Sequence, residues 1–135
     1  MSELLIFDTS VLVDELRTGR HRQRIASTKG IVRISSVVLA ELSRGAVSAQ
    51  ERTFVRDLAR HRPILTPTVN HWLESGQILA DMRSRLGFTP AKLRDLHFDL
   101  LIALTARSHG ARLITSNRAD FELIRRYRKF ELEIW

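Results

Sequence analysis

The hydrophobic pattern of this chain alternates between short runs rich in β-branched residues and longer stretches with helical periodicity. Strand-like runs lie at residues 4–7, 31–34, 64–66, 112–115 and 130–134, and helical stretches at 11–16, 36–45, 51–60, 69–86, 92–108 and 120–126. Strands that alternate with helices are typical of an α/β domain, because each helix returns the chain to start a parallel strand. We therefore expect a mostly parallel sheet, with residues 130–134 as an edge strand.

Composition limits the organisation of the chain and the chemistry open to it. The 135 residues contain no linker, internal repeat or low-complexity tract, so we expect a single domain over residues 1–135. The absence of cysteine excludes disulfide scaffolds, cysteine nucleophiles and thiolate zinc sites. The longest apolar run, residues 100–104, is too short to span a bilayer, and the first residues do not resemble a secretory signal. We expect a cytoplasmic protein without a membrane partner.

The charge of the chain is strongly positive. Twenty-two basic residues against 15 acidic ones give a formal net charge of +7, and 19 of the 22 are arginine. Arginine binds phosphate through a planar, bidentate set of donors, so the excess favours a polyanionic partner such as nucleic acid. A GC-rich genome gives the same excess of arginine without any functional reason.

Two aspartates lie near the carboxyl ends of predicted strands. Asp8 comes at the carboxyl end of the strand at residues 4–7, and Asp120 lies shortly after the strand at residues 112–115. Both also have a structural interpretation. Asp8 suits a helix N-cap, and Asn117 as N-cap with Asp120 at the third helical position resembles a capping box.

Two further carboxylates lie on helical faces that the pattern predicts to be buried. Glu41 shares a face with Val37 and Val38, where a solvated surface glutamate is the alternative interpretation. Asp99 is surrounded by apolar residues between positions 96 and 104, as in a core helix. A buried salt bridge to Arg94 or His97 is the alternative there, because an unpaired buried carboxylate is costly.

The four carboxylates are expected to meet at one edge of the sheet. In an open α/β sheet the binding crevice lies beyond the carboxyl ends of the strands, where the strand order reverses. If the second and third strands extend the sheet on one side of the first and the fourth joins on the other, Asp8 and Asp120 face each other. The helices that carry Glu41 and Asp99 can pack beside them. Clustered carboxylates either take up protons or bind a cation, and a set of oxygen ligands suits Mg²⁺ or Mn²⁺.

Other motifs are weak or missing. The five histidines form no zinc motif, and we interpret them as surface or packing residues. Ser10 and Asn117, next to Asp8 and Asp120, either orient the carboxylates or cap helices. The chain has no glycine-rich phosphate loop, dinucleotide fingerprint or serine-hydrolase elbow.

Four segments together resemble a known family. They are FDTSVLVD at residues 7–14, AEL at 40–42 followed by Gly45, DLLIA at 99–103 and TSNRADF at 115–121. In order and spacing they resemble the PIN-domain endoribonucleases of the VapC type, which are the toxins of toxin–antitoxin pairs. The resemblance covers essentially the whole chain.

The resemblance implies a fold, an activity and partners. The fold would be a three-layer α/β/α sandwich with a five-stranded, mostly parallel sheet. Asp8, Glu41, Asp99 and Asp120 would be the catalytic, metal-binding acids for Mg²⁺ or Mn²⁺, with Ser10 and Asn117 as polar support. Glu41 would be either a ligand through water or the general base. The protein would be a homodimer that cleaves RNA and is neutralised by an antitoxin.

Two other classes of protein also fit parts of the pattern. A response-regulator receiver domain has a similar length and an acidic pocket, but here the third strand is followed by Pro67-Thr68-Val69-Asn70, without the required acid. A non-catalytic nucleic-acid-binding module, in which the carboxylates are caps and salt bridges, would bind RNA regardless of EDTA.

Overall fold

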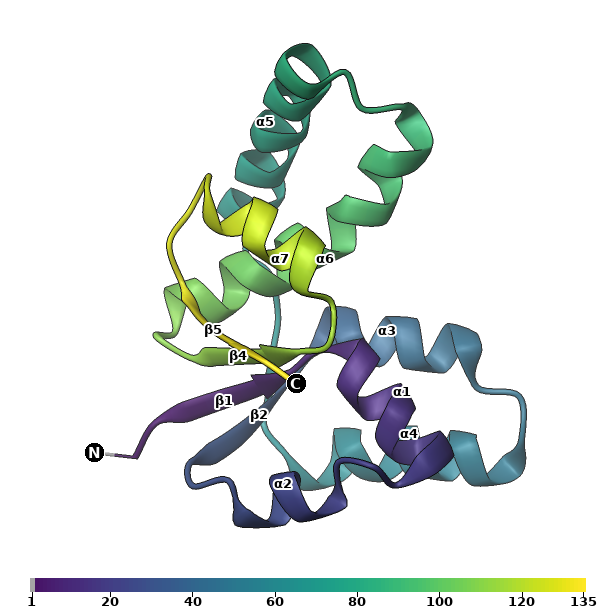
Figure 1. The fold of residues 1–135 in the computed structure, drawn as a ribbon. Coiled ribbons are helices and arrows are strands. Elements are labelled where there is room, and N and C mark those ends of the chain that lie inside the picture. Colours follow the sequence, from purple (N-terminus) through teal and green to yellow (C-terminus); the bar gives the residue numbers. More distant parts are fainter. Residues whose placement is uncertain (1) are drawn as a thin grey trace.

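The fold is built around a five-stranded parallel sheet. The computed structural model describes residues 2–135, and its strands follow the order β3-β2-β1-β4-β5 (Figure 1). Every neighbouring pair is parallel. The strands are β1 (Leu4–Phe7), β2 (Ile31–Ser35), β3 (Ile64–Leu65), β4 (Arg112–Thr115) and β5 (Glu131–Ile134). This confirms the predicted α/β class, the parallel pairing and the edge position of the last strand.

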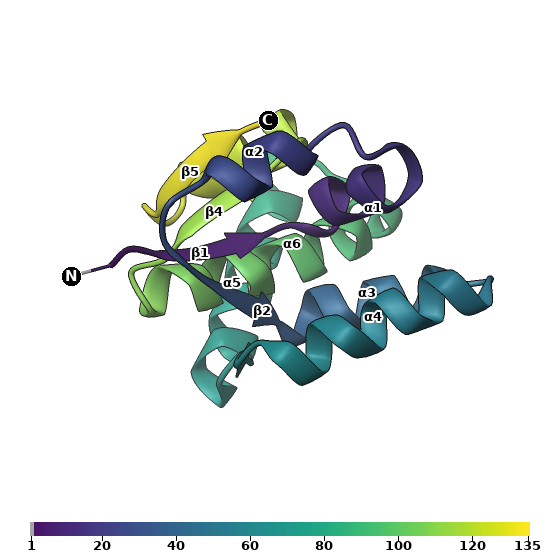
Figure 2. The same cartoon turned by 90° about the horizontal axis from the view of Figure 1, so that it is seen from below.

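Helices cover both faces of this sheet. They are α1 (Thr9–Thr18), α2 (Arg22–Ser27), α3 (Ser36–Gly45), α4 (Ala49–His61), α5 (Val69–Leu86), α6 (Pro90–Ser108) and α7 (Arg118–Arg125). Figures 1 and 2 show α5, α6 and α7 on one side of the sheet and α1, α2 and α4 on the other. The result is the three-layer α/β/α sandwich that the resemblance implied.

The largest differences from the predicted elements lie at helix starts. Helices α4 and α6 begin earlier than the apolar periodicity suggested, because Ser48 and Thr89 accept hydrogen bonds from the backbone of the first turn. The short helix α2 was not predicted at all. It has no buried residue, so it carries no apolar periodicity that a sequence pattern can reveal.

The core explains why α6 is apolar on all sides. Leu96, Leu100 and Leu101 are fully buried, as are Leu5 and Ile6 of the central strand β1. Helix α6 packs against α5, α7, α3 and β4, so little of its circumference reaches solvent. A carboxylate within this helix therefore has to lie where another polar group or the surface is close.

The strand order reverses between β1 and β4, which are neighbours although more than a hundred residues separate them. Phe7 pairs with Ile114, and the backbone N–H of Asp8 donates to the carbonyl of Ile114 at 2.8 Å. This register places the residues that follow the two strands side by side at the carboxyl edge of the sheet. Strands β2 and β3 extend the sheet on one side of β1 and β4 joins on the other, as the expected meeting of Asp8 and Asp120 required.

None of the helices within residues 2–135 combines the length and the apolar character needed to cross a membrane.

Candidate functional site

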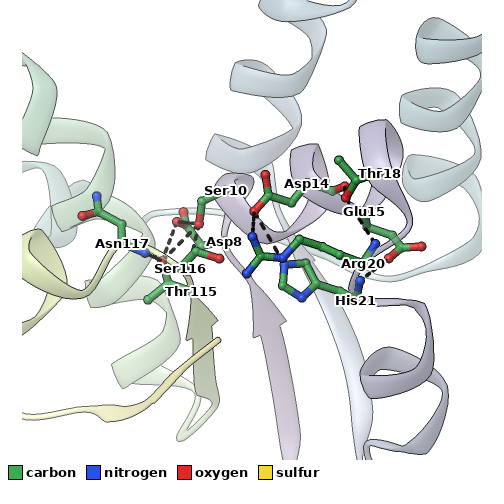
Figure 3. A network of polar contacts seen from close by, with 10 residues as sticks. All are labelled: Asp8, Ser10, Asp14, Glu15, Thr18, Arg20, His21, Thr115, Ser116 and Asn117. Atoms are coloured by element: carbon green, nitrogen blue, oxygen red, sulfur yellow. Dashed lines mark hydrogen bonds and ion pairs between the residues drawn. The ribbon is translucent and has the colours of Figure 1, made fainter.

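Asp8 is held at the carboxyl edge of the sheet by two hydroxyl groups. Its side chain is 3% exposed, and its Oδ2 accepts hydrogen bonds from Ser10 Oγ and Thr115 Oγ1, each at 2.8 Å (Figure 3). Asp8 occupies the N-cap position of α1, but its side chain makes no capping hydrogen bond. Asp8 therefore stands at the expected N-cap position, but its side chain does not cap the helix, because one of its oxygens accepts from hydroxyl donors instead.

The same hydroxyls join the ends of β1 and β4. Ser10 Oγ accepts from the backbone N–H of Ser116 at 3.1 Å, and Thr115 Oγ1 accepts from that of Asn117 at 2.9 Å (Figure 3). Thr115 is buried. Sequence reasoning missed Thr115, because only the pairing of β1 with β4 brings this strand residue to Asp8.

Glu41 projects from α3 toward the same edge. Its Oε1 accepts a hydrogen bond from Thr9 Oγ1 at 2.8 Å. Burial raises the pKa of Glu41, and the charge of Asp8 raises it further; the Thr9 hydrogen bond and Arg44 act in the opposite direction. Glu41 is half-buried and hydrogen-bonded to Thr9, so it is not a freely solvated surface glutamate.

Asp99 experiences the charges of all three other acids. Its pKa is raised from 3.8 to about 8, most of all by burial and further by the charges of Asp8, Glu41 and Asp120. Lys92 lowers it. Four carboxylates that are far apart in the chain thus interact at one place. We call Asp8, Glu41, Asp99 and Asp120 the acidic site.

The salt bridge that the sequence offered for Asp99 is not formed. Within the described part of the chain, neither Arg94 nor His97 makes an ion pair with Asp99. The ring of His97 instead lies 3.1 Å from Ser75 Oγ and packs edge-on against Trp72. The buried salt bridge is therefore not the reason for a carboxylate in α6.

Asp120 has partners for both of its oxygens. Lys92 Nζ lies 2.8 Å from Oδ1, and Asn117 Nδ2 donates to Oδ2 at 3.1 Å. Asn117 also caps α7 by accepting from the backbone N–H of Asp120 at 3.4 Å. The second hydrogen bond of a capping box would run from the backbone N–H of Asn117 to the Asp120 side chain. It is not formed, because this N–H donates to Thr115 Oγ1 instead. Sequence reasoning missed Lys92 as a neighbour of Asp120, since 28 residues separate the two.

A cavity of about 630 Å³ opens beside the acidic site. It is lined by three of the four acids together with Asn117, and by the side chains of two arginines; its lining comprises Glu41, Arg44, Arg94, Asp95, His97, Phe98, Asp99, Asn117 and Asp120. Asp8 is nearly buried and does not line this cavity. The cavity therefore has an acidic floor flanked by cations, a suitable arrangement for a metal ion with a phosphate beside it.

The remaining polar cluster in Figure 3 has a packing role. His21 is 2% exposed and lies 3.6 Å from Asp14, and its backbone N–H donates to Glu15. Its ring lies 5.5 Å from that of Trp135, which also packs against Phe7. His21, just before α2, thus contacts α1 through Asp14 and Glu15, and it also packs against Trp135, which follows β5. These contacts agree with the packing interpretation of the histidine.

The donors of the acidic site fit a hard divalent ion, although they are not gathered into a finished set of ligands. In residues 2–135 no three acidic or histidine side chains are close enough to hold one metal ion together. Asp8, Glu41 and Asp120 are each held by their own hydroxyl, amide or ammonium partners. The carboxylates repel one another, as the raised pKa of Asp99 shows, and this repulsion favours keeping them apart. A bound cation would relieve it.

The comparison with known families agrees with this geometry. The PIN domain family model matches residues 5–127, which include all four acids of the acidic site, and the chain therefore belongs to the PIN domain family. No curated protein is significantly similar to the chain in sequence.

Several solved structures share the fold. VapBC2 from Rickettsia felis, bound to a DNA fragment from its promoter, has a TM-score of 0.69 at 22% identity over 98% of both chains. VapBC-5 from Mycobacterium tuberculosis has a TM-score of 0.66 at 21% identity, again over 98% of both chains. A toxin–antitoxin complex from Klebsiella pneumoniae has a TM-score of 0.60 at 27% identity, covering 87% of this chain and 89% of the other.

Proposed function

We propose that this chain is a divalent-metal-dependent endoribonuclease that acts in the cytoplasm as the toxin of a toxin–antitoxin pair. The observation that supports this most strongly is the convergence of carboxylates from distant segments on Asp99, whose pKa is raised to about 8 by burial and by the charges of Asp8, Glu41 and Asp120. Such an arrangement is costly unless the site has a use for it, and perturbed acids beside a cavity are typical of functional sites. Membership of the PIN domain family agrees with a nuclease.

We assign the divalent ion, Mg²⁺ or Mn²⁺, to Asp8, Glu41, Asp99 and Asp120. What the ion supplies is activation of water and neutralisation of the charge that develops on the phosphate. Asp8 is fixed for its role by Ser10 and Thr115. Asn117 fixes Asp120 and at the same time caps α7.

Glu41 is suited to accept a proton from the attacking water. Burial and the neighbouring charge of Asp8 raise its pKa, which makes the carboxylate a stronger base. The Thr9 hydroxyl orients one of its oxygens, and the other has no hydrogen-bond partner within residues 2–135. We therefore prefer the role of general base for Glu41 over that of a ligand through water.

The basic residues around the cavity are suited to hold RNA. Arg44 and Arg94 line it together with the acids, and the chain as a whole carries a formal charge of +7. Contacts of arginine with phosphate are independent of sequence and fix the position of the backbone. We propose that these residues place the scissile phosphate over the acidic floor.

An antitoxin and a second copy of the chain are the proposed protein partners. The support for an antitoxin is the similarity in fold to solved toxin–antitoxin complexes. Apolar side chains on α5 supply a surface for a protein partner: Val69 is 75% exposed, Leu73 63% and Trp72 49%. Exposed groups of this size often mark an interface.

The decisive experiment is cleavage of total RNA by the purified chain, with Asp99→Asn as the control. We expect cleavage in Mg²⁺ or Mn²⁺, none in EDTA, and a loss of at least a hundredfold in the variant. Sequencing of the product ends would identify the sites of cleavage. Equal cleavage by both proteins would refute the assignment, and RNA binding without cleavage, unaffected by EDTA, would indicate the non-catalytic binding module.

A test in cells addresses the role as a toxin. Expression of the chain without a partner should stop growth, and Asp99→Asn should restore it while the protein accumulates to the same level. If the unmodified chain is harmless at that level, the proposed toxin role is wrong even if cleavage is observed.

A further inference from the structure

Lys92 lies at an unusual place for a cation, in the first turn of α6. Thr89 caps this helix by accepting from the backbone N–H of Lys92 at 3.2 Å, and Pro90 is its first residue. The amino end of a helix carries a partial positive charge, so a lysine in the first turn is unfavourable by itself. A nearby anion would offset this cost.

The anion that compensates Lys92 belongs to the acidic site. Lys92 Nζ lies 2.8 Å from Asp120 Oδ1, and the two side chains are 39% and 20% exposed. Among residues 2–135, this is the only ion pair that any of the four acids makes. The pair connects the first turn of α6 to the first turn of α7.

Within residues 2–135, each of the other three acids has a carboxylate oxygen without a hydrogen-bond partner, whereas Asp120 does not. Both Asp120 oxygens have partners, in Lys92 and Asn117. By contrast, no hydrogen bond is formed in the described residues by Asp8 Oδ1, by Glu41 Oε2 or by the Asp99 side chain. A divalent ion that binds at Asp8, Glu41 or Asp99 therefore displaces no ammonium group, whereas at Asp120 it has to displace that of Lys92.

We propose that Lys92 serves as the second cation of the acidic site, holding Asp120 so that the chain binds one divalent ion where the four carboxylates alone would bind two. This inference rests on the proposed function for the presence of a divalent ion. When all four are ionised, the carboxylates carry four negative charges. One divalent ion and Lys92 reduce this charge to one, and two divalent ions would neutralise it. Lys92 is thus a positioning residue for Asp120, and Asp120 is left out of the direct contacts of the ion.

Counting of bound Mn²⁺ tests the proposal without reference to RNA cleavage. The free ion is followed by electron paramagnetic resonance and the heat of binding by calorimetry, at constant ionic strength. We expect one Mn²⁺ per chain in the unmodified protein and in Lys92→Arg, and two in Lys92→Gln. The double variant Lys92→Gln/Asp120→Asn should return to one. Lys29→Gln, which changes an exposed lysine without an ion pair, is the matched control and should bind one.

Thermal unfolding separates this role from a purely structural one. In EDTA, Lys92→Gln should unfold at a lower temperature than the unmodified chain, because the acids lose a countercharge. Mn²⁺ should then raise the unfolding temperature more in the variant than in the unmodified chain. A structural salt bridge would lower the unfolding temperature equally with and without Mn²⁺ and leave the ion count unchanged, which would overturn the proposal.

A second variant keeps the test valid even if Lys92→Gln does not fold. Because Lys92 already engages Asp120, we expect Asp120→Asn to keep one bound Mn²⁺ with less than about a tenfold loss of affinity, whereas Asp99→Asn loses it. If Asp120→Asn loses the ion as completely as Asp99→Asn, or if the unmodified chain binds two ions, the role of Lys92 is refuted while the proposed function stands. If no variant and no unmodified chain binds Mn²⁺, the metal-dependent function fails, and the inference fails with it.

Discussion

The substitution Asp99→Asn should make the metal-free protein more stable, although it removes a side chain from the middle of a core helix. The carboxyl of Asp99 has a pKa of about 8 in the folded protein against an ordinary value of 3.8. The unfolded chain therefore releases this proton between those two values while the folded chain retains it. Stability that is fully present below about pH 4 is lost as the pH rises toward about 8.

The size of the effect follows from the two pKa values. Each pKa unit corresponds to about 1.4 kcal/mol, so between pH 3.8 and about pH 7 the full difference would cost about 4 kcal/mol. Asp99 is partly exposed, and solvent screens its interactions, so we expect about half of this, roughly 2 kcal/mol. Asparagine has a similar shape and carries no charge to repel Asp8, Glu41 and Asp120.

The assay is urea unfolding in EDTA at several pH values between about 4 and 8, with the free energy of unfolding compared between the two proteins. The two should be equally stable near pH 4, and the variant should be more stable by roughly 2 kcal/mol near pH 7. Asp57→Asn, on the exposed surface of α4, is the matched control and should show no such gap. A variant that is less stable than the unmodified chain near pH 7, or a gap that does not depend on pH, would refute the argument from repulsion.

Addition of Mn²⁺ should reverse the order of stability. An ion at a hundredfold its dissociation constant stabilises the protein that binds it by about 2.7 kcal/mol. The unmodified chain should gain this stability and Asp99→Asn should gain little, as measured by the same unfolding experiment. An equal gain in both proteins would mean that Asp99 is not part of a metal site.

Three further substitutions test separate parts of the structure. Thr115→Val leaves buried Asp8 without one of its donors and should lower the free energy of unfolding by about 1–3 kcal/mol in urea, with Thr115→Ser recovering part of the loss. Gly30→Ala should destabilise the protein, because Gly30 has a φ of 140° and an added Cβ would lie 2.8 Å from the carbonyl of Glu3; Gly45→Ala, in open space, should not. In the inactive Asp99→Asn background, Arg44→Gln should reduce the slope of log RNA affinity against log salt by about 1 in filter binding, and an unchanged slope would contradict contact of Arg44 with phosphate.

Local pattern was sufficient to locate the strands and most of the helices. The runs at 4–7 and 112–115 coincide with β1 and β4, because central parallel strands are buried on both faces and are read as continuous apolar segments. The edge strand β3 is shorter than predicted and is confined to Ile64–Leu65. Only Ile64 and Leu65 pair with β2, so the predicted strand at 64–66 is one residue longer than the part that forms the ladder.

The sequence pattern singled out four acids that the structure brings near one another, but it did not give the contacts of Asp8 and Asp99. A carboxylate in an apolar context is visible in the sequence, whichever group it contacts. The N-cap for Asp8 and the salt bridge for Asp99 were considered because both use partners that are near in the sequence. The structure instead gives Asp8 a hydroxyl partner from β4, Thr115, and places Asp99 near the charges of three acids from other elements.

What the sequence determined by itself was the succession of elements and the presence of charges in dry positions, since both depend on neighbours along the chain. Thr115 beside Asp8 and Lys92 beside Asp120 were decided by the tertiary structure alone. Each of these contacts joins segments that meet only after β4 inserts next to β1 and α6 packs against α7. Periodicity describes which face of an element is buried, but the partner on that face is set by how the elements pack together.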